Sequence, residues 1–167
     1  MNRPHDLPAV ETDRSPFQSP SNPRLRILVV EDDADIRHLN TEVLTRNGYH
    51  VDAAEDGAFA WKALTSQSYD LLVTDNSMPK VTGFELLRKL HEARMPVPVI
   101  MATSVLPEWK FRQNPELTPA AMLVKPYTVP ELLRAVKTVL HQVSNPAETA
   151  GQSSYGQGQP LTHHLPL

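Results

Sequence analysis

Cysteine is absent from this chain of 167 residues. Without thiols the protein forms no disulfide, no thiolate metal site and no cysteine nucleophile, which argues against a small secreted scaffold. The chain also lacks an apolar run long enough for a signal peptide or for a membrane span of about 20 residues. These absences predict a cytoplasmic protein with no membrane partner.

An excess of positive charge is missing as well. The 16 lysine and arginine residues are outnumbered by 19 aspartate and glutamate residues, which gives a formal net charge of -3. Proteins that bind nucleic acid through its phosphates carry a broad basic field, and this composition supplies none. We therefore expect no nucleic acid among the partners.

The ends of the chain differ in composition from its middle. Residues 1–23 hold five prolines among polar residues, and residues 144–167 are rich in glycine, serine, glutamine and proline. Such segments bury too little apolar surface to offset the entropy of ordering the chain. The sequence predicts a flexible N-terminal arm over 1–23, one folded domain over 24–143, and a flexible C-terminal tail over 144–167.

Within the predicted domain, short apolar runs alternate with amphipathic stretches, which is typical of βα units around a parallel sheet. Three of the apolar runs contain almost no polar residue, as expected for strands covered on both faces. The pattern predicts an α/β fold with a doubly wound, five-stranded parallel sheet and helices on both faces. The predicted strands are 25–30, 49–53, 71–74, 97–102 and 122–124.

Two helix starts carry the spacing of a capping box. Thr82 stands three residues before Glu85, and Thr128 stands three residues before Glu131. In this arrangement the hydroxyl and the carboxylate each satisfy a backbone amide that the first turn leaves unpaired. The spacing predicts helices that begin directly after both threonines.

The fourth helix is expected to be short or irregular. Three prolines interrupt residues 104–120, and proline removes a donor and clashes with the preceding turn. Two aromatic residues, Trp109 and Phe111, lie in this region. We interpret both as covering the sheet, with a docking patch for a partner as the alternative.

Polar side chains that could carry chemistry follow four of the five predicted strands. The carboxyl ends of parallel strands share one edge of a sheet, and ligands bind at that edge where the strand order reverses. We therefore expect these side chains to converge. They are Glu31 and Asp32 after the first strand, Asp75 after the third, Thr103 after the fourth and Lys125 after the fifth.

The three carboxylates predict a magnesium site. Carboxylates a few ångströms apart repel one another by a few kcal/mol per pair, at an effective dielectric constant of about 20. A divalent cation relieves that repulsion, and oxygen ligands without His or Cys select a hard ion such as Mg²⁺. We expect Asp32 and Asp75 to bind directly, the backbone carbonyl of Ser77 to add a third ligand, and Glu31 to act through water.

With its charge neutralised, the Asp75 carboxylate can attack phosphorus and become an acyl phosphate. Lys125 and Thr103 would then stabilise the phosphoryl oxygens. Acids that follow a strand also often cap the next helix, and Asp33 or Asp35 is expected to do so. The coincidence at several strand ends favours the phosphoacceptor interpretation over simple capping.

Several short motifs match one family. They are Leu28-Val29-Val30-Glu31-Asp32-Asp33, Asp75 followed by Met78-Pro79 and Gly83, Thr103-Ser104, and Lys125-Pro126. Over about residues 24–143 the chain resembles the receiver domain of response regulators in two-component signalling, in its stand-alone, single-domain form. The resemblance implies a flavodoxin-like strand order of 2-1-3-4-5.

The same resemblance implies a phosphorelay function. It makes Asp75 the acceptor of a phosphoryl group from a sensor histidine kinase or a histidine phosphotransfer protein, with Mg²⁺ as cofactor and slow hydrolysis of the aspartyl phosphate. Thr103 becomes the switch hydroxyl, Lys125 contacts the phosphoryl group, and a cis peptide joins Lys125 to Pro126. Because only the predicted tail follows residue 143, we expect the output to act in trans on an unknown protein target.

Two other classes of protein share part of this pattern. Haloacid dehalogenase-type phosphatases resemble this arrangement but need a second aspartate two residues past the nucleophile, where this chain has Ser77. We therefore expect no enzyme beyond self-phosphorylation and self-dephosphorylation. A phosphate-independent pseudo-receiver remains the alternative, because Met122 stands where receivers usually carry the aromatic residue that reports activation.

Overall fold

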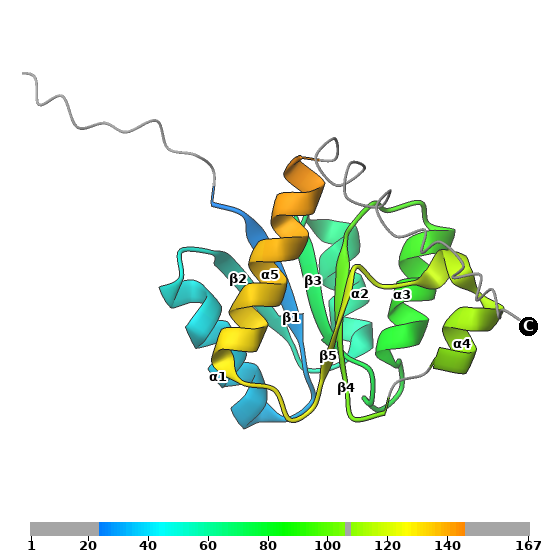
Figure 1. Ribbon diagram of the computed structural model, residues 1–167, viewed down its shortest axis with the longest axis horizontal. Coiled ribbons are helices and arrows are strands. Elements are labelled where there is room, and N and C mark those ends of the chain that lie inside the picture. The colour runs from blue at the N-terminus through cyan, green and yellow to red at the C-terminus, as the bar shows by residue number, and fades with distance from the viewer. Residues whose placement is uncertain (1–23, 106–107, 146–167) are drawn as a thin grey trace, which may run out of the picture.

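The computed structural model describes residues 24–105 and 108–145. They form an α/β domain around five parallel strands in the order β2-β1-β3-β4-β5, as predicted (Figure 1). The predicted arm, and the predicted tail from residue 146 onward, lie outside the described residues. The strands are β1 Arg26–Val30, β2 His50–Ala54, β3 Leu71–Asp75, β4 Val99–Thr103 and β5 Ala121–Val124.

Helices cover both faces of the sheet, which confirms the doubly wound arrangement. Helices α1 and α5 lie against one face, and α2 and α3 lie against the other (Figure 1). Within the part of the chain that is described, no helix is long and apolar enough to cross a membrane. The helices are α1 Ala34–Arg46, α2 Gly57–Ser66, α3 Gly83–Glu92, α4 Glu108–Gln113 and α5 Val129–Ser144, with a 3₁₀ turn, η1, at Pro115–Leu117.

The core has two halves separated by the sheet, because successive side chains on a strand point to opposite faces. Along β4, Val99 and Met101 belong to the half under α2 and α3, whereas Ile100 and Ala102 belong to the half under α1 and α5. All four are at most 2 % exposed. Burial on both faces explains why β1, β3 and β4 are rich in apolar residues.

The strand bounds differ slightly from those predicted. Asp75 and Thr103 were expected to follow their strands, but each is the last residue of its strand. The hydrogen-bond ladder continues through them because Asp75 pairs with Ala102 and Thr103 with Val124. At the other end of the domain, Ser144 was assigned to the tail but is the last residue of α5.

The helix starts agree with the predicted capping residues. The Thr82 hydroxyl accepts a hydrogen bond from the amide of Glu85 (3.2 Å), and the Glu85 carboxylate accepts one from the amide of Thr82 (2.8 Å). The Glu131 carboxylate accepts in the same way from the Thr128 amide (2.7 Å). At α1 the cap is Asp33, whose Oδ1 accepts from the amides of the first turn.

The fourth helix is short, as the prolines predicted, and η1 follows it. Phe111 packs against the half of the core under α2 and α3, with its ring centroid 5.8 Å from that of Phe84. It therefore helps to cover that face of the sheet, as expected. The prediction was wrong for Trp109, whose side chain is 61 % exposed. A helix of six residues buries only one side, and Trp109 lies on the other.

A cluster toward the amino ends of the strands links Arg26, the first residue of β1, with Asp52 in the middle of β2 and Tyr69, two residues before β3. Arg26 Nε donates to Asp52 Oδ2 (2.7 Å), and the Tyr69 hydroxyl donates to the same oxygen (2.9 Å). Burial by itself would raise the pKa of Asp52, but the hydrogen bonds from Arg26 and Tyr69 outweigh it and hold that pKa below its usual value. Burial and the bond to Asp52 raise the pKa of Tyr69 to about 12.

This cluster predicts a pH-dependent loss of stability. At pH 7 we expect Asp52→Asn to lower the free energy of unfolding by about 1 kcal/mol, a modest value because the pair is partly exposed. Since folding lowers the pKa of Asp52, its contribution is present above about pH 4 and is lost as the pH falls through the folded-state pKa. Urea denaturation of both proteins should therefore show a smaller difference at about pH 3 than at pH 7.

The matched control is Glu92→Gln, which breaks an exposed i,i+4 pair with Arg88. We expect it to change the free energy of unfolding by less than about 0.5 kcal/mol at either pH. An Asp52→Asn difference that stays constant from pH 7 to pH 3 would contradict the role of the ionised carboxylate.

Candidate functional site

The predicted acids converge at the carboxyl edge of the sheet. One carboxylate oxygen from each of Glu31, Asp32 and Asp75 lies within 4.8 Å of the other two. Glu31 and Asp75 are buried at 2 % and 6 % exposure, whereas Asp32 is exposed to solvent. The cluster thus has two carboxylates fixed inside the domain and one at its open side.

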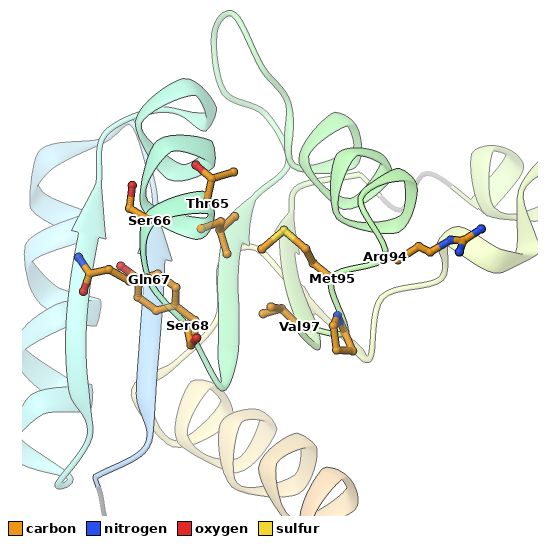
Figure 2. Close-up of a pocket in the computed structure, with 10 residues that line it drawn as sticks. Thr65, Ser66, Gln67, Ser68, Arg94, Met95 and Val97 are labelled. Atoms are coloured by element: carbon orange, nitrogen blue, oxygen red, sulfur yellow. The ribbon is translucent and has the colours of Figure 1, made fainter.

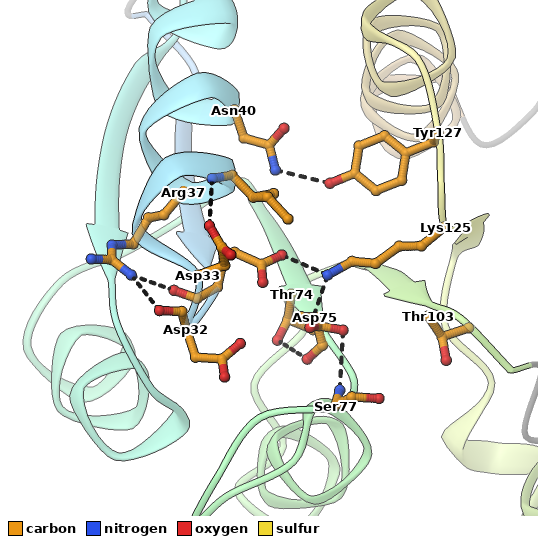
Figure 3. Close-up of polar contacts among 12 residues, drawn as sticks. Asp32, Asp33, Arg37, Asn40, Thr74, Asp75, Ser77, Thr103, Lys125 and Tyr127 are labelled. Atoms are coloured by element: carbon orange, nitrogen blue, oxygen red, sulfur yellow. Dashed lines mark hydrogen bonds and ion pairs between the residues drawn. The ribbon is translucent and has the colours of Figure 1, made fainter.

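Lys125 joins the two buried carboxylates. Its Nζ lies 2.8 Å from Glu31 Oε2 and 2.9 Å from Asp75 Oδ2 (Figure 3). The lysine comes from the end of β5, and the peptide to Pro126 is cis, as the resemblance implied. Lys125 is 94 positions from Glu31 and 50 positions from Asp75 in the sequence, and the fold brings all three into one charged network.

Burial and charge act against each other in this network. Burial raises the pKa of Glu31, the hydrogen bond from Lys125 opposes that rise, and the charge of Asp75 adds to it. Burial alone would lower the pKa of Lys125, but the hydrogen bonds to Glu31 and Asp75 raise it above its usual value. The ammonium is thus held charged between its two partners.

The loop after β3 fixes the other oxygen of Asp75. The amide of Ser77 donates to Asp75 Oδ1 at 3.0 Å, so both carboxylate oxygens of Asp75 have a donor (Figure 3). Gly83, the first residue of α3, packs directly behind the acceptor: a Cβ at this position would lie 2.5 Å from the carbonyl oxygen of Asp75. Only glycine allows α3 to approach the end of β3 so closely.

Thr103 lies at the same edge but makes its hydrogen bonds within its own loop. Its hydroxyl donates to the carbonyl of Val105 (2.7 Å) and accepts from the amide of Val105 (3.3 Å). Among the residues drawn in Figure 3, Thr103 stands beside the network without a dashed line to Lys125 or Asp75. The sequence predicted its location correctly, and the structure shows its hydroxyl turned to Val105.

Arg37 is a residue of the site that sequence reasoning missed. From α1, its Nη1 donates to the carbonyls of Glu31 (2.7 Å) and Asp32 (3.2 Å), which holds the loop bearing both acids (Figure 3). A single arginine on an amphipathic helix gives no signal in the sequence that separates this role from simple exposure. Its position four residues after Asp33 places it over that loop only once the helix is known.

A mostly apolar pocket of about 330 Å³ adjoins the acids between α1 and the loop after β5. Ile36 and Leu39 line one side of it, and Pro126 lines another. The buried amide of Asn40 donates to the hydroxyl of Tyr127 (2.9 Å), which ties α1 to that loop. Lys125 also lines the pocket, so the pocket directly borders the charged network.

A larger pocket, of about 450 Å³, lies at the opposite edge of the sheet (Figure 2). Two of its polar side chains are already engaged, because the hydroxyls of Thr65 and Ser66 donate to carbonyls of their own helix. The side chain of Arg94 points away from it. Size alone therefore does not identify the functional site; the charged network does.

The acids present fit a hard divalent cation. All three candidate side-chain ligand groups are carboxylates, which is the donor chemistry that Mg²⁺ prefers. The open side at Asp32 leaves room for the water ligands that Mg²⁺ retains. Lys125 balances part of the negative charge, so the site is ordered without requiring every carboxylate to bind metal.

The sheet and the polar site at its carboxyl edge define a doubly wound α/β domain with its site at the topological switch point. Within that class, residues 27–137 match the family model described as the response regulator receiver domain. The chain belongs to this family.

Two curated relatives illustrate the match. The chain is 31 % identical to the transcriptional regulatory protein RprY of Bacteroides fragilis over 120 residues, which are 72 % of this chain and 51 % of RprY. It is 32 % identical over 118 residues to SilR of Salmonella typhimurium, named a probable transcriptional regulatory protein, covering 71 % of this chain and 52 % of SilR. The chain thus spans about half the length of these relatives.

Solved structures match nearly over their full length. The chemotaxis response regulator CheY4 of Vibrio cholerae superposes with a TM-score of 0.63 at 27 % identity, covering 70 % of this chain and 98 % of CheY4. The response regulator TrrA of Thermotoga maritima, crystallised with Mg²⁺ and BeF, gives a TM-score of 0.60 at 32 % identity, covering 69 % and 98 %. These neighbours confirm the flavodoxin-like fold.

Proposed function

We propose that the chain is a phosphorylation-controlled switch of a two-component phosphorelay in the cytoplasm. The observation that carries the proposal is the ammonium of Lys125 held between Glu31 and Asp75, with Asp32 completing the acidic cluster. Asp75 is the acceptor, and the donor is a sensor histidine kinase or a histidine phosphotransfer protein. Receiver domains are regulatory phosphoacceptor domains, and this assignment gives the chain no activity on other substrates.

In the proposed reaction, a carboxylate oxygen of Asp75 forms a bond to phosphorus as the bond from phosphorus to the donor imidazole breaks. The imidazole nitrogen keeps the electron pair, so atoms and charge balance. Mg²⁺, when held by Asp32, Asp75 and the carbonyl of Ser77, with Glu31 acting through water, would neutralise the charge of the carboxylates and of the incoming phosphoryl group.

Two further residues act on the transferred group. Lys125, already 2.9 Å from Asp75, is placed to stabilise negative charge on the phosphoryl oxygens. Thr103 would give up its bond to the Val105 carbonyl and donate to the phosphoryl group instead. That exchange couples phosphorylation to the loop after β4.

Protein partners are proposed on both sides of the switch. A donor protein that brings a phosphohistidine to Asp75 would find apolar contacts in the pocket between α1 and Pro126. A separate target in trans would contact apolar side chains near Thr103, since Val105 and Val124 are 75 % and 52 % exposed. The negative net charge favours proteins over nucleic acid as partners.

Intact-mass analysis after incubation with acetyl phosphate tests the proposal. We expect one phosphoryl adduct in the presence of Mg²⁺ and none when the metal is removed with a chelator. Transfer from acetyl phosphate releases acetate and needs no partner protein, so the result concerns this chain alone. An absence of adduct with Mg²⁺ present would instead favour a phosphate-independent pseudo-receiver.

A further inference from the structure

The loop that carries Ser77 runs from the acceptor to the start of α3, over residues 76–82. Its first half is anchored near the site: the amide of Asn76 donates to the carbonyl of Ala102 (2.8 Å), and its side-chain oxygen accepts from the amide of Phe84 (3.2 Å). Met78 then enters the core at 5 % exposure. These contacts fix the part of the loop that lies next to α3. They do not involve the tip of the loop at Lys80 and Val81.

The tip is held by α2. Lys80 Nζ lies 2.7 Å from Oδ2 of Asp56, the N-cap residue of α2, whose other oxygen accepts from the amides of Ala58 and Phe59 (both 2.9 Å). The Asp56 side chain is 5 % exposed and the Lys80 side chain is 69 % exposed. The carboxylate is thus a buried, fixed anchor, and the lysine reaches to it from solvent.

Two further observations show that the tip is constrained. Lys80 has a φ of 66°, in the left-handed region that a lysine adopts only when its surroundings hold it there. Beside it, Val81 lies against Gly57, where an added Cβ would come within 2.6 Å of Val81 Cβ. The loop and the start of α2 therefore meet in both a packed contact and an ion pair.

Charge at this contact favours the ion pair. The hydrogen bond from Lys80, followed by the backbone amides of α2, lowers the pKa of Asp56, and the same carboxylate raises the pKa of Lys80. A pair with an exposed partner adds little to global stability. Its geometric effect on the loop is therefore the more important one.

We propose that Asp56 and Lys80 are positioning residues for the metal site, because their ion pair fixes the loop 76–82 and with it the peptide of Ser77. The inference rests on the proposed function, in which the Ser77 carbonyl is a metal ligand. Neither residue touches the acidic cluster. They act through the backbone of the loop, in the way that residues outside a coordination sphere orient the ligands within it.

The test is the affinity of the full chain for Mg²⁺ alone, measured by isothermal titration calorimetry without phosphoryl donor. We expect Lys80→Gln and Asp56→Asn each to weaken binding by about tenfold, at the low end of the effect of outer-shell residues. Asparagine caps helices as well as aspartate does, so Asp56→Asn preserves the start of α2. Lys80→Arg, which retains the charge and the reach, is expected to bind Mg²⁺ like the wild type.

The sign of the effect separates positioning from plain electrostatics. If only charge mattered, removal of the lysine would strengthen Mg²⁺ binding and removal of the aspartate would weaken it. The double variant should bind no more weakly than either single variant, because both remove one interaction. Amide hydrogen exchange over 76–82, without metal, should accelerate in both single variants and remain unchanged in Lys62→Ala, which removes an exposed lysine of α2.

Opposite signs for the two variants, or unchanged affinity and exchange in both, would overturn the positioning role while leaving the metal site intact. A wild-type chain that binds no Mg²⁺ would overturn the metal site and the positioning role together. The two failures are therefore distinguishable in one experiment.

Discussion

Asp75→Asn is expected to abolish the phosphoryl adduct formed from acetyl phosphate, with a loss of more than about a hundredfold in yield. The asparagine amide has no carboxylate oxygen with which to attack phosphorus. The shape of the side chain is preserved, so the bond from the Ser77 amide can still form. Intact-mass analysis of both proteins at saturating Mg²⁺ measures the effect.

The control for this variant is Asp32→Asn, which removes another acid of the same cluster. Asp32 is a proposed metal ligand and not the acceptor, so its loss should raise the Mg²⁺ concentration required while the adduct still forms. A full adduct in Asp75→Asn would show that another residue accepts the phosphoryl group, and peptide mapping of the adduct would then identify it.

Lys125→Met is expected to lower the free energy of unfolding by about 3 kcal/mol without metal. Removal of one partner from a buried charged network leaves the remaining charges uncompensated, at a cost of about 3–5 kcal/mol. We expect the low end because Asp32 opens the cluster to water. The side chains of Glu31 and Asp75 are only 3 % and 7 % exposed, and methionine keeps most of the volume of the lysine stem.

Urea denaturation in the presence of a chelator measures this loss. In the proposed function Mg²⁺ binds the folded state, so its addition should recover part of the stability of Lys125→Met. Lys62→Met serves as the control, since Lys62 is an exposed lysine on α2, and we expect a change of less than about 0.5 kcal/mol. Equal losses of unfolding free energy in the two variants would show that the bonds of Lys125 to Glu31 and Asp75 do not stabilise the fold.

The parallel sheet and the convergence of the acids with Lys125 were predictable from the pattern of apolar runs. Apolar runs covered on both faces leave a strong signal, and the carboxyl ends of parallel strands meet at one edge. Asp75 and Lys125 stand directly at those ends, so their contact follows once the order is known. The order itself came from the resemblance of the motifs and not from periodicity.

The orientation of individual side chains was not predictable in this way. Thr103 was placed at the correct edge, yet its hydroxyl bonds to the backbone of its own loop, a local competition that spacing does not reveal. The link between Asp56 and Lys80 joins residues 24 positions apart. It depends on a left-handed backbone at Lys80, for which the residue type gives no warning.

The division of the core by the sheet gives the proposed switch a direction. Thr103 shares its side of β4 with Val99 and Met101, two positions apart along the strand, and Met101 pairs with Met122 on β5. In the proposed switch, a displacement that begins at the threonine would first meet the side chains on that side, which pack toward α3 and η1. The pocket beside α1 lies on the opposite side, but Ser104, the residue after Thr103, lines it together with Lys125. In the proposed switch, one movement of the loop after β4 would therefore change both the surface near Val105 and the wall of this pocket.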